Sequence, residues 1–147
     1  MFVVRLHGDH VVLTGPCGAD AWYIESHDED DPMEVVRRLS TNLMGPPLLV
    51  HSTSWRRGPG GVFLSFLVVI GEDQAPDLDS VPIMRADLAR NSATEAAKAI
   101  SAGQVVEHAL RHLAWLAQDD PAVAATLSPA WLAALAGYVP APFRHLA

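Results

Sequence analysis

The first part of the chain alternates apolar and polar residues over short runs that end at turn residues. Residues 2–6 and 10–13 flank Gly8 and Asp9, and this arrangement predicts a β-hairpin. Residues 21–24 predict a third strand, because tryptophan, tyrosine and isoleucine are all favoured in strands. We therefore expect three strands before the first helix.

The pattern changes to a helical period after an acidic stretch. Asp31 is placed to be an N-cap residue, Pro32 fits the first helical turn, and Glu34 completes an Asp-x-x-Glu capping pattern. Gly45, followed by two prolines, is suited to end the helix. These signals predict a helix over residues 32–44. Its expected apolar face consists of Val36, Leu39 and Leu43.

A second hairpin is predicted in the middle of the chain. Residues 48–56 and 62–70 are strand-like, and the Gly- and Pro-rich segment 56–61 predicts the turn. The second arm is apolar on both faces, which predicts a central strand covered by helices on at least one side. Strict alternation along the first arm places Leu49, His51, Thr53 and Trp55 on one face, and Leu48, Val50, Ser52, Ser54 and Arg56 on the other.

The chain becomes mainly helical after a polar connector at residues 72–80. Residues 81–84 predict an edge strand or extended chain, because Pro82 has no amide proton for a central ladder. Ser92 and Glu95 form a capping-box pattern that predicts a long helix over residues 92–117. The expected apolar stripe of this helix is Val106, Ala109, Leu110, Leu113 and Ala117.

Two shorter helices are expected near the end of the chain. Asp120 and Ser128 each precede a proline in the manner of an N-cap, and Gly137 is suited to end the second helix. Together the elements predict a single α+β domain over residues 1–147, with a small, mostly antiparallel sheet. One short helix follows the N-terminal strands, a hairpin lies at the centre, and a C-terminal helical segment packs on the sheet. The strand-rich part covers residues 1–72 and the mainly helical part residues 81–147.

Composition narrows the class of protein. The formal net charge is −7, which disfavours nucleic acid and anionic membranes as partners because both are bound through clustered cations. The longest apolar run, 62–70, is too short to span a bilayer, and Arg5 and His7 interrupt the apolar residues that a signal peptide needs. The lone Cys17 offers no intramolecular disulfide. These features predict a cytoplasmic protein.

The candidate ligand-binding residues lie on the central hairpin and are His51, Ser52, Ser54, Arg56 and Arg57. Nucleophilic catalysis needs a base within reach of a hydroxyl, but alternation predicts that His51 points away from Ser52 and Ser54. The two arginines beside the glycine-rich turn are suited to hold a phosphate or a carboxylate. The alternative is a solvated hairpin tip, with small polar residues on a half-buried sheet face.

His108 and His112 are candidate metal ligands, because they lie one helical turn apart. A metalloprotease-type helix has a glutamate directly after the first histidine, whereas Ala109 occupies that position here. The alternative is that the two histidines pack inside the fold or face a partner. The acidic run 25–34 lacks the spacing of an EF-hand, and helix capping explains several of its charges. The sequence identifies no cofactor.

A short segment resembles a known family. Strands, an acid-led helix containing Arg37-Arg38-Leu39 and a hydrophobic hairpin follow one another as in the middle of Nudix hydrolases, over about residues 25–72. The family's metal-binding box contains a glycine-led element and a run of glutamates, and residues 38–42 contain no glutamate. The resemblance implies a degenerate fold of that type, one that binds a nucleotide or another phosphate-bearing molecule.

Two classes of function fit these observations. The absence of a complete catalytic motif favours a non-catalytic binding or interaction domain of bacterial type, with a protein or small-molecule ligand and a homodimer as the expected assembly. The alternative is a small hydrolase or transferase acting on a phosphate- or carboxylate-bearing substrate. Its site would combine residues 51–57 with His108 or His112. A pocket shared by His51, Arg56 and the two helical histidines would favour the enzyme.

Overall fold

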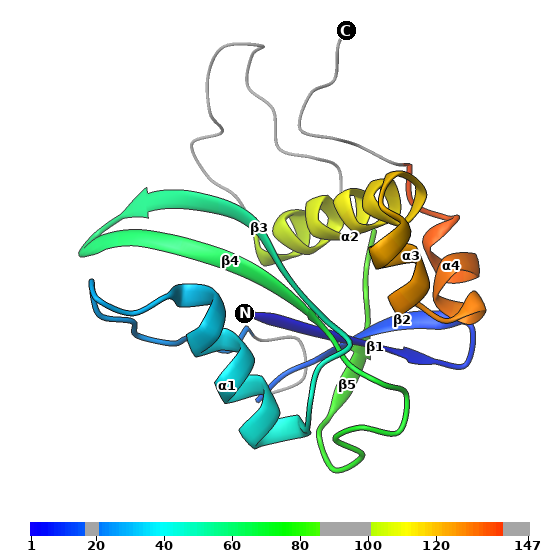
Figure 1. The fold of residues 1–147 in the computed structure, drawn as a ribbon, viewed down its shortest axis with the longest axis horizontal. Helices are drawn as coiled ribbons and strands as arrows, with labels where there is room; N and C mark the ends of the chain where they lie inside the picture. The colour runs from blue at the N-terminus through cyan, green and yellow to red at the C-terminus, as the bar shows by residue number, and fades with distance from the viewer. Residues whose placement is uncertain (17–20, 86–100, 140–147) are drawn as a thin grey trace, which may run out of the picture.

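The computed structural model describes residues 1–16, 21–85 and 101–139, and these form three layers (Figure 1). A five-stranded sheet with the order β3-β4-β1-β2-β5 makes the middle layer. Helix α1 covers one face of the sheet, and α2, α3 and α4 lie on the other (Figure 1). The predicted α+β architecture, with a mostly antiparallel sheet and C-terminal helices packed on it, is confirmed.

The N-terminal hairpin forms as the alternation predicts. Strands β1 (Phe2–His7) and β2 (His10–Thr14) pair in antiparallel fashion around a turn in which Gly8 has a φ of 63°. The second edge of β1 pairs in parallel with β4, from Phe2 opposite Leu67 to Val4 opposite Val69. Strand β1 is therefore enclosed on both edges.

The strand predicted over residues 21–24 is wrong. Both edges of β1 are already occupied by β2 and β4, so the segment has no edge of that strand to join. Its backbone bonds instead to Met1, just before β1, where the amide of Trp22 donates to the carbonyl of Met1 at 2.9 Å. The side chains of Trp22 and Ile24 nevertheless pack against the core on the α1 side.

Helix α1 (Pro32–Met44) has the predicted bounds. The Asp31 side chain accepts a hydrogen bond from the Met33 amide at 2.9 Å, and Gly45 ends the helix with a φ of 83°. The predicted apolar face needs one correction, because Leu43 is 45% exposed. The predicted Val36 is buried together with Ser40 and Met44, at i, i+4 and i+8, and the predicted Leu39 packs partly buried against the same core. The Ser40 hydroxyl donates to the Val36 carbonyl.

The central hairpin is confirmed as strands β3 (Leu49–Gly58) and β4 (Gly61–Val69), joined at Pro59 and Gly60. Gly60 and Gly61 have φ values of 89° and 145°, a region that favours glycine. The second half of β4, from Phe66 to Val69, is covered on both faces, as its apolar sequence predicts, whereas residues 61–64 are exposed. Leu67 and Val69 pack beneath α2, and Phe66 and Val68 pack beneath α1.

Strand β3 contains one extra residue, Thr53. The register pairs Ser52 with Phe66 and Ser54 with Ser65, so Thr53 has no partner position in β4. The Thr53 side chain is buried, and its hydroxyl donates to the Ser65 carbonyl at 3.1 Å. This β-bulge shifts the phase of all later side chains, so the alternation predicted for β3 is wrong beyond Ser52.

The shifted phase can be followed across the hairpin, because residues opposite one another in an antiparallel pair point to the same face. His51 pairs with Leu67 and Ser54 pairs with Ser65, and the two β4 residues are two positions apart. His51 and Ser54 therefore share the face that α2 covers. Beyond the bulge, the α2 side of the hairpin receives Ser54 and Arg56, and the α1 side receives Trp55 and Arg57.

The segment after β4 ends in β5 (Ser80–Pro82), which pairs with β2 at the edge of the sheet, as Pro82 requires. Ser80 is held by two neighbours, because its hydroxyl accepts from Arg5 at 3.0 Å and lies 2.8 Å from that of Thr14. Arg5 also donates to the Gln74 carbonyl at 3.0 Å. These bonds attach the polar connector to the two N-terminal strands.

Helix α2 (Ala102–Asp119) begins later than predicted. Ser101 has extended backbone and forms a capping box with Gln104, so α2 starts directly after Ser101. The Ser92 and Glu95 capping pattern lies outside the described residues. Helices α3 (Pro121–Thr126) and α4 (Pro129–Leu135) start at the predicted N-caps, Asp120 and Ser128.

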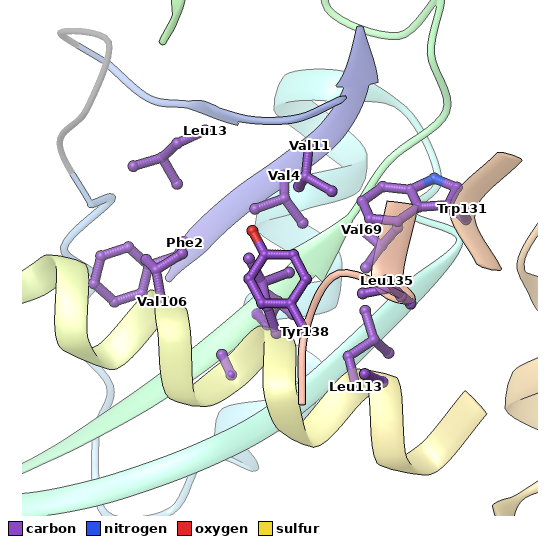
Figure 2. Close-up of a cluster of buried hydrophobic side chains, with 14 of the residues drawn as sticks. Phe2, Val4, Val11, Leu13, Val69, Val106, Leu113, Trp131, Leu135 and Tyr138 are labelled. Carbon is purple, nitrogen blue, oxygen red and sulfur yellow. The ribbon is translucent and has the colours of Figure 1, made fainter. Parts of the chain in front are cut away.

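The larger core lies between the sheet and the C-terminal helices. Figure 2 shows apolar side chains of β1, β2 and β4 meeting those of α2 and α4, with Tyr138 beside them. Trp131 is 1% exposed and the α2 residues Leu110 and Leu113 are fully buried. Among the helices that the structure describes, we find none with the length and apolar character that a bilayer crossing requires.

Candidate functional site

Three histidines, one from the central hairpin and two from α2, meet where β3 contacts α2. His51 Nε2 lies 2.7 Å from His112 Nδ1, and the centroids of these two rings are 4.6 Å apart. The ring of His108 stacks on that of His112 with a centroid distance of 6.3 Å. The structure thus joins one candidate from the hairpin with both candidates from the helix, and we call these residues the histidine cluster.

The helical periodicity of α2 explains how the cluster is buried. His108 and His112 are four residues apart and share a side of the helix, while Leu110 and Leu113 face the sheet. Trp115 stacks on His112 with a centroid distance of 5.5 Å and an interplanar angle of 6°. His112 is left only 3% exposed, beside strand β3.

The hydrogen bond between His51 and His112 limits the charge that the cluster can carry. One of the two nitrogens must hold a proton and the other must present a lone pair. If both rings were fully protonated, two N–H groups would face each other at this distance. The bond therefore persists only while at least one ring is neutral.

Burial is the main electrostatic influence on all three histidines. It lowers the pKa of His112 to about 4, with further lowering by the neighbouring His51 and His108. Burial also lowers the pKa of His51, and the neighbouring His108 lowers it further. Burial lowers the pKa of His108 as well. For His108, a hydrogen bond to the backbone of Thr53 opposes the shift and the charge of Arg111 adds to it. The cluster is consequently uncharged at neutral pH.

The remaining hairpin candidates do not complete a catalytic arrangement. Ser52 lies on the opposite face from His51, whereas the bulge places Ser54 on the same face. Within the part of the chain that the structure describes, no hydrogen bond joins Ser54 to a histidine. Arg56 is exposed and lies over the Phe63 ring at 5.5 Å, and Arg57 points to the other side of the hairpin. The two arginines therefore do not converge on one anion.

The histidine cluster does not form a recognisable metal centre. Among the described residues, no group of three or more histidine, cysteine, aspartate or glutamate side chains is placed to hold a metal ion. His112 Nδ1 is engaged with His51. Metal binding by His108 and His112 stays a prediction.

A buried ion-pair network next to the cluster was not foreseen from the sequence. Glu107 is fully buried. Each of its carboxylate oxygens accepts a hydrogen bond from Arg85 at 3.0 Å, and one of them also accepts from Arg111 at 2.7 Å. Arg85 also donates to the Gly137 carbonyl at 2.8 Å and lies 4.2 Å from the centroid of the Tyr138 ring. The i,i+4 spacing of Glu107 and Arg111 was a readable signal, but the contribution of Arg85 was not.

A pocket of about 380 Å³ lies beside this network, between β2, β5 and α4. Arg85, His10 and Tyr138 contribute to its lining, and His10 is paired with Asp9 at 3.1 Å. None of the seven residues proposed from the sequence as ligand or metal contacts lines it. The pocket is therefore separate from the histidine cluster.

The far end of the central hairpin exposes large apolar side chains. Figure 1 shows this end projecting beyond α2. On its α1 side, Trp55 is opposite Leu64 and Arg57 is opposite Val62, and we call these four residues the distal hairpin face. Trp55 is 67% exposed, Val62 58% and Leu64 45%. Alternation without the bulge would have placed Trp55 on the side of His51.

Comparison with protein-family models, with curated proteins and with solved structures found no match in any of the three.

We predict that the histidine cluster makes stability depend on pH. An unfolded chain binds protons at histidine near pH 6.5, whereas the folded pKa of His112 is about 4, so acidification between these values favours unfolding. His112 alone should lower the free energy of unfolding by about 2 kcal/mol between about pH 7 and about pH 5. Urea denaturation of wild type and of His112→Gln measures this difference, and the variant should lose that part of the pH dependence.

The exposed His27 provides the matched control, because His27→Gln removes a histidine outside the cluster. This variant should keep the pH dependence of wild type. Equal losses of stability on acidification in His112→Gln and wild type would contradict the role assigned to His112.

We also predict that the two arginines hold a buried charge in place. Replacing both Arg85 and Arg111 with glutamine removes both guanidinium groups from the buried Glu107 carboxylate and should cost about 3–5 kcal/mol in unfolding free energy. Adding Glu107→Met should recover most of this loss, because the desolvated charge is then gone. Chemical denaturation of the double and triple variants tests the prediction, and equal stability of the two would contradict it.

Proposed function

We propose that this chain is a non-catalytic protein-binding domain that contacts its partner through the distal hairpin face. The observation that carries the proposal is the exposure of Trp55, Val62 and Leu64 on one side of a projecting strand pair, next to Arg57. Contiguous exposed apolar residues are characteristic of interaction surfaces. Tryptophan and arginine are also the residue types most often found at the energetic centres of protein interfaces.

The rigidity of the hairpin supports a binding role. Its two strands pair without interruption from Ser54 opposite Ser65 to Gly58 opposite Gly61. At its base, His51 and Thr53 connect the hairpin to α2 through His112 and His108. A surface that is ordered before binding loses little conformational entropy when the partner arrives.

The hydrolase or transferase alternative receives less support. A phosphate or carboxylate substrate would need available cations near the histidines, but burial keeps the histidine cluster uncharged at neutral pH and the neighbouring Arg111 is paired with Glu107. Arg56 and Arg57 diverge from the hairpin instead of meeting above the cluster. The binding role requires no catalytic group and uses the surface as it stands.

Site-specific photo-crosslinking tests the proposal. The photoreactive residue p-benzoylphenylalanine replaces Trp55 in one variant and Met84, which is 78% exposed, in a control. Irradiation of cells that produce each variant should give a covalent protein adduct from position 55 and none from position 84. The adducts are detected by gel electrophoresis and identified by mass spectrometry.

Loss of the apolar face should remove the adduct. We expect Leu64→Ser, combined with the crosslinker at position 55, to reduce the yield several-fold, because Leu64 is the cross-strand neighbour of that position. Leu132→Ser is the matched control on α4, since Leu132 is 39% exposed. Equal adduct yields from positions 55 and 84 would refute the protein-binding role.

A further inference from the structure

Granted the protein-binding function proposed above, we infer that the partner at the distal hairpin face is a second copy of this chain. The contact joins Arg57 and the apolar side chains of one copy to the acidic segment of the other. This acidic segment comprises residues 25–31, with exposed carboxylates at Glu25, Asp28, Glu29, Asp30 and Asp31. The dimer has two equivalent contacts, related by a twofold axis.

Charge complementarity is the first argument. The chain has a formal net charge of −7, yet the exposed end of the hairpin carries two adjacent arginines. Among the described residues, no ion pair engages Arg57, Asp28 or Glu29. The hairpin end and the acidic segment are thus two exposed surfaces of opposite charge, and each is electrostatically complementary to the other.

Only part of the acidic segment has an internal role. Asp31 caps α1 through its bond to the Met33 amide, and Asp30 accepts a hydrogen bond from the His27 amide at 3.2 Å. Asp28 and Glu29 precede these two residues and are exposed. Helix capping therefore explains Asp31 but does not require Asp28 or Glu29 to be acidic.

The placement of the two surfaces is the second argument. Residues on either side of the acidic segment, Ile24 and Met33, pack against a core that contains Phe66 of β4. Phe66 lies on the same face of β4 as Leu64, which belongs to the distal hairpin face. Figure 1 shows the segment before α1 and the hairpin end toward the same side of the molecule. Both surfaces therefore belong to the α1 side of the sheet.

This placement favours a second copy over an unrelated partner. A twofold interface uses the same patch on both subunits, so one patch must contain both complementary parts. The α1 side of this chain meets that requirement with a basic, apolar strand pair and an acidic segment. In such a dimer, each copy covers the exposed Trp55, Val62 and Leu64 of the other copy.

Charge reversal with complementation tests the inference. One variant carries Arg57→Glu, and the other carries Asp28→Arg with Glu29→Arg. Each should form homodimers about tenfold or more weakly than wild type, because like charges then face each other in both contacts. When the two variants are mixed, each hairpin faces a segment of opposite charge, and the heterodimer should approach wild-type affinity. Analytical ultracentrifugation measures all of these dissociation constants.

Matched controls separate the specific contact from net charge. Arg38→Glu reverses an exposed arginine on α1, and a variant with Glu72→Arg and Asp73→Arg reverses two exposed acids after β4. These controls change the net charge as much as the test variants do and should dimerise like wild type. Weakening by the controls equal to that of the test variants, or failure of the mixed variants to associate, would overturn the inference.

The crosslinking experiment distinguishes failure of this inference from failure of the proposed function. A self-adduct from position 55 has twice the 15.8 kDa mass of the chain and contains only its peptides. An adduct with another protein would keep the binding role and overturn the dimer. A wild-type chain that stays monomeric up to about 1 mM would likewise overturn the dimer.

Discussion

The single extra residue in β3 determines what the rest of the hairpin can do. Because Thr53 has no partner in β4, every later side chain of β3 changes face. Trp55 and Arg57 are thereby directed to the α1 side, away from the histidines. The same residue engages His108 through its backbone and Ser65 through its hydroxyl. One local irregularity therefore separates a buried polar cluster from an exposed apolar surface on the same pair of strands.

Helix α2 is attached to both edges of the sheet by polar contacts. His112 reaches β3 through His51, while Glu107 reaches the opposite edge through Arg85, which follows β5. Apolar burial beneath the helix is non-directional and would tolerate rotation or sliding. Hydrogen bonds at its two sides restrict such movement, because each buried polar group would lose its partner. The apolar stripe thus provides the attraction and the polar side chains fix the orientation.

Local signals in the sequence predicted most of the elements, and long-range contacts limited the rest. Asp31, Asp120 and Ser128 each mark a helix start through chemistry contained within a few residues. The bulge depends on the register between two strands, which alternation along β3 alone cannot reveal. The union of His51 with His108 and His112 likewise required the helix to be placed over the sheet. Glu107 precedes His108 in the sequence, but the sequence did not indicate that Arg85, at the other edge of the sheet, pairs with this buried carboxylate.

The parallel pairing of β1 with β4 has a consequence for how the chain folds. Strand β1 can pair with β2 as soon as both have been synthesised, but its other edge cannot pair until residues 67–69 are present. During synthesis from the N-terminus, this apolar strand therefore keeps one unpaired backbone edge until the second hairpin has emerged from the ribosome. Contacts between such distant residues slow folding and expose the nascent chain to aggregation. We infer that this edge of β1 stays unpaired until about the first seventy residues have been synthesised, so the centre of the sheet is completed late.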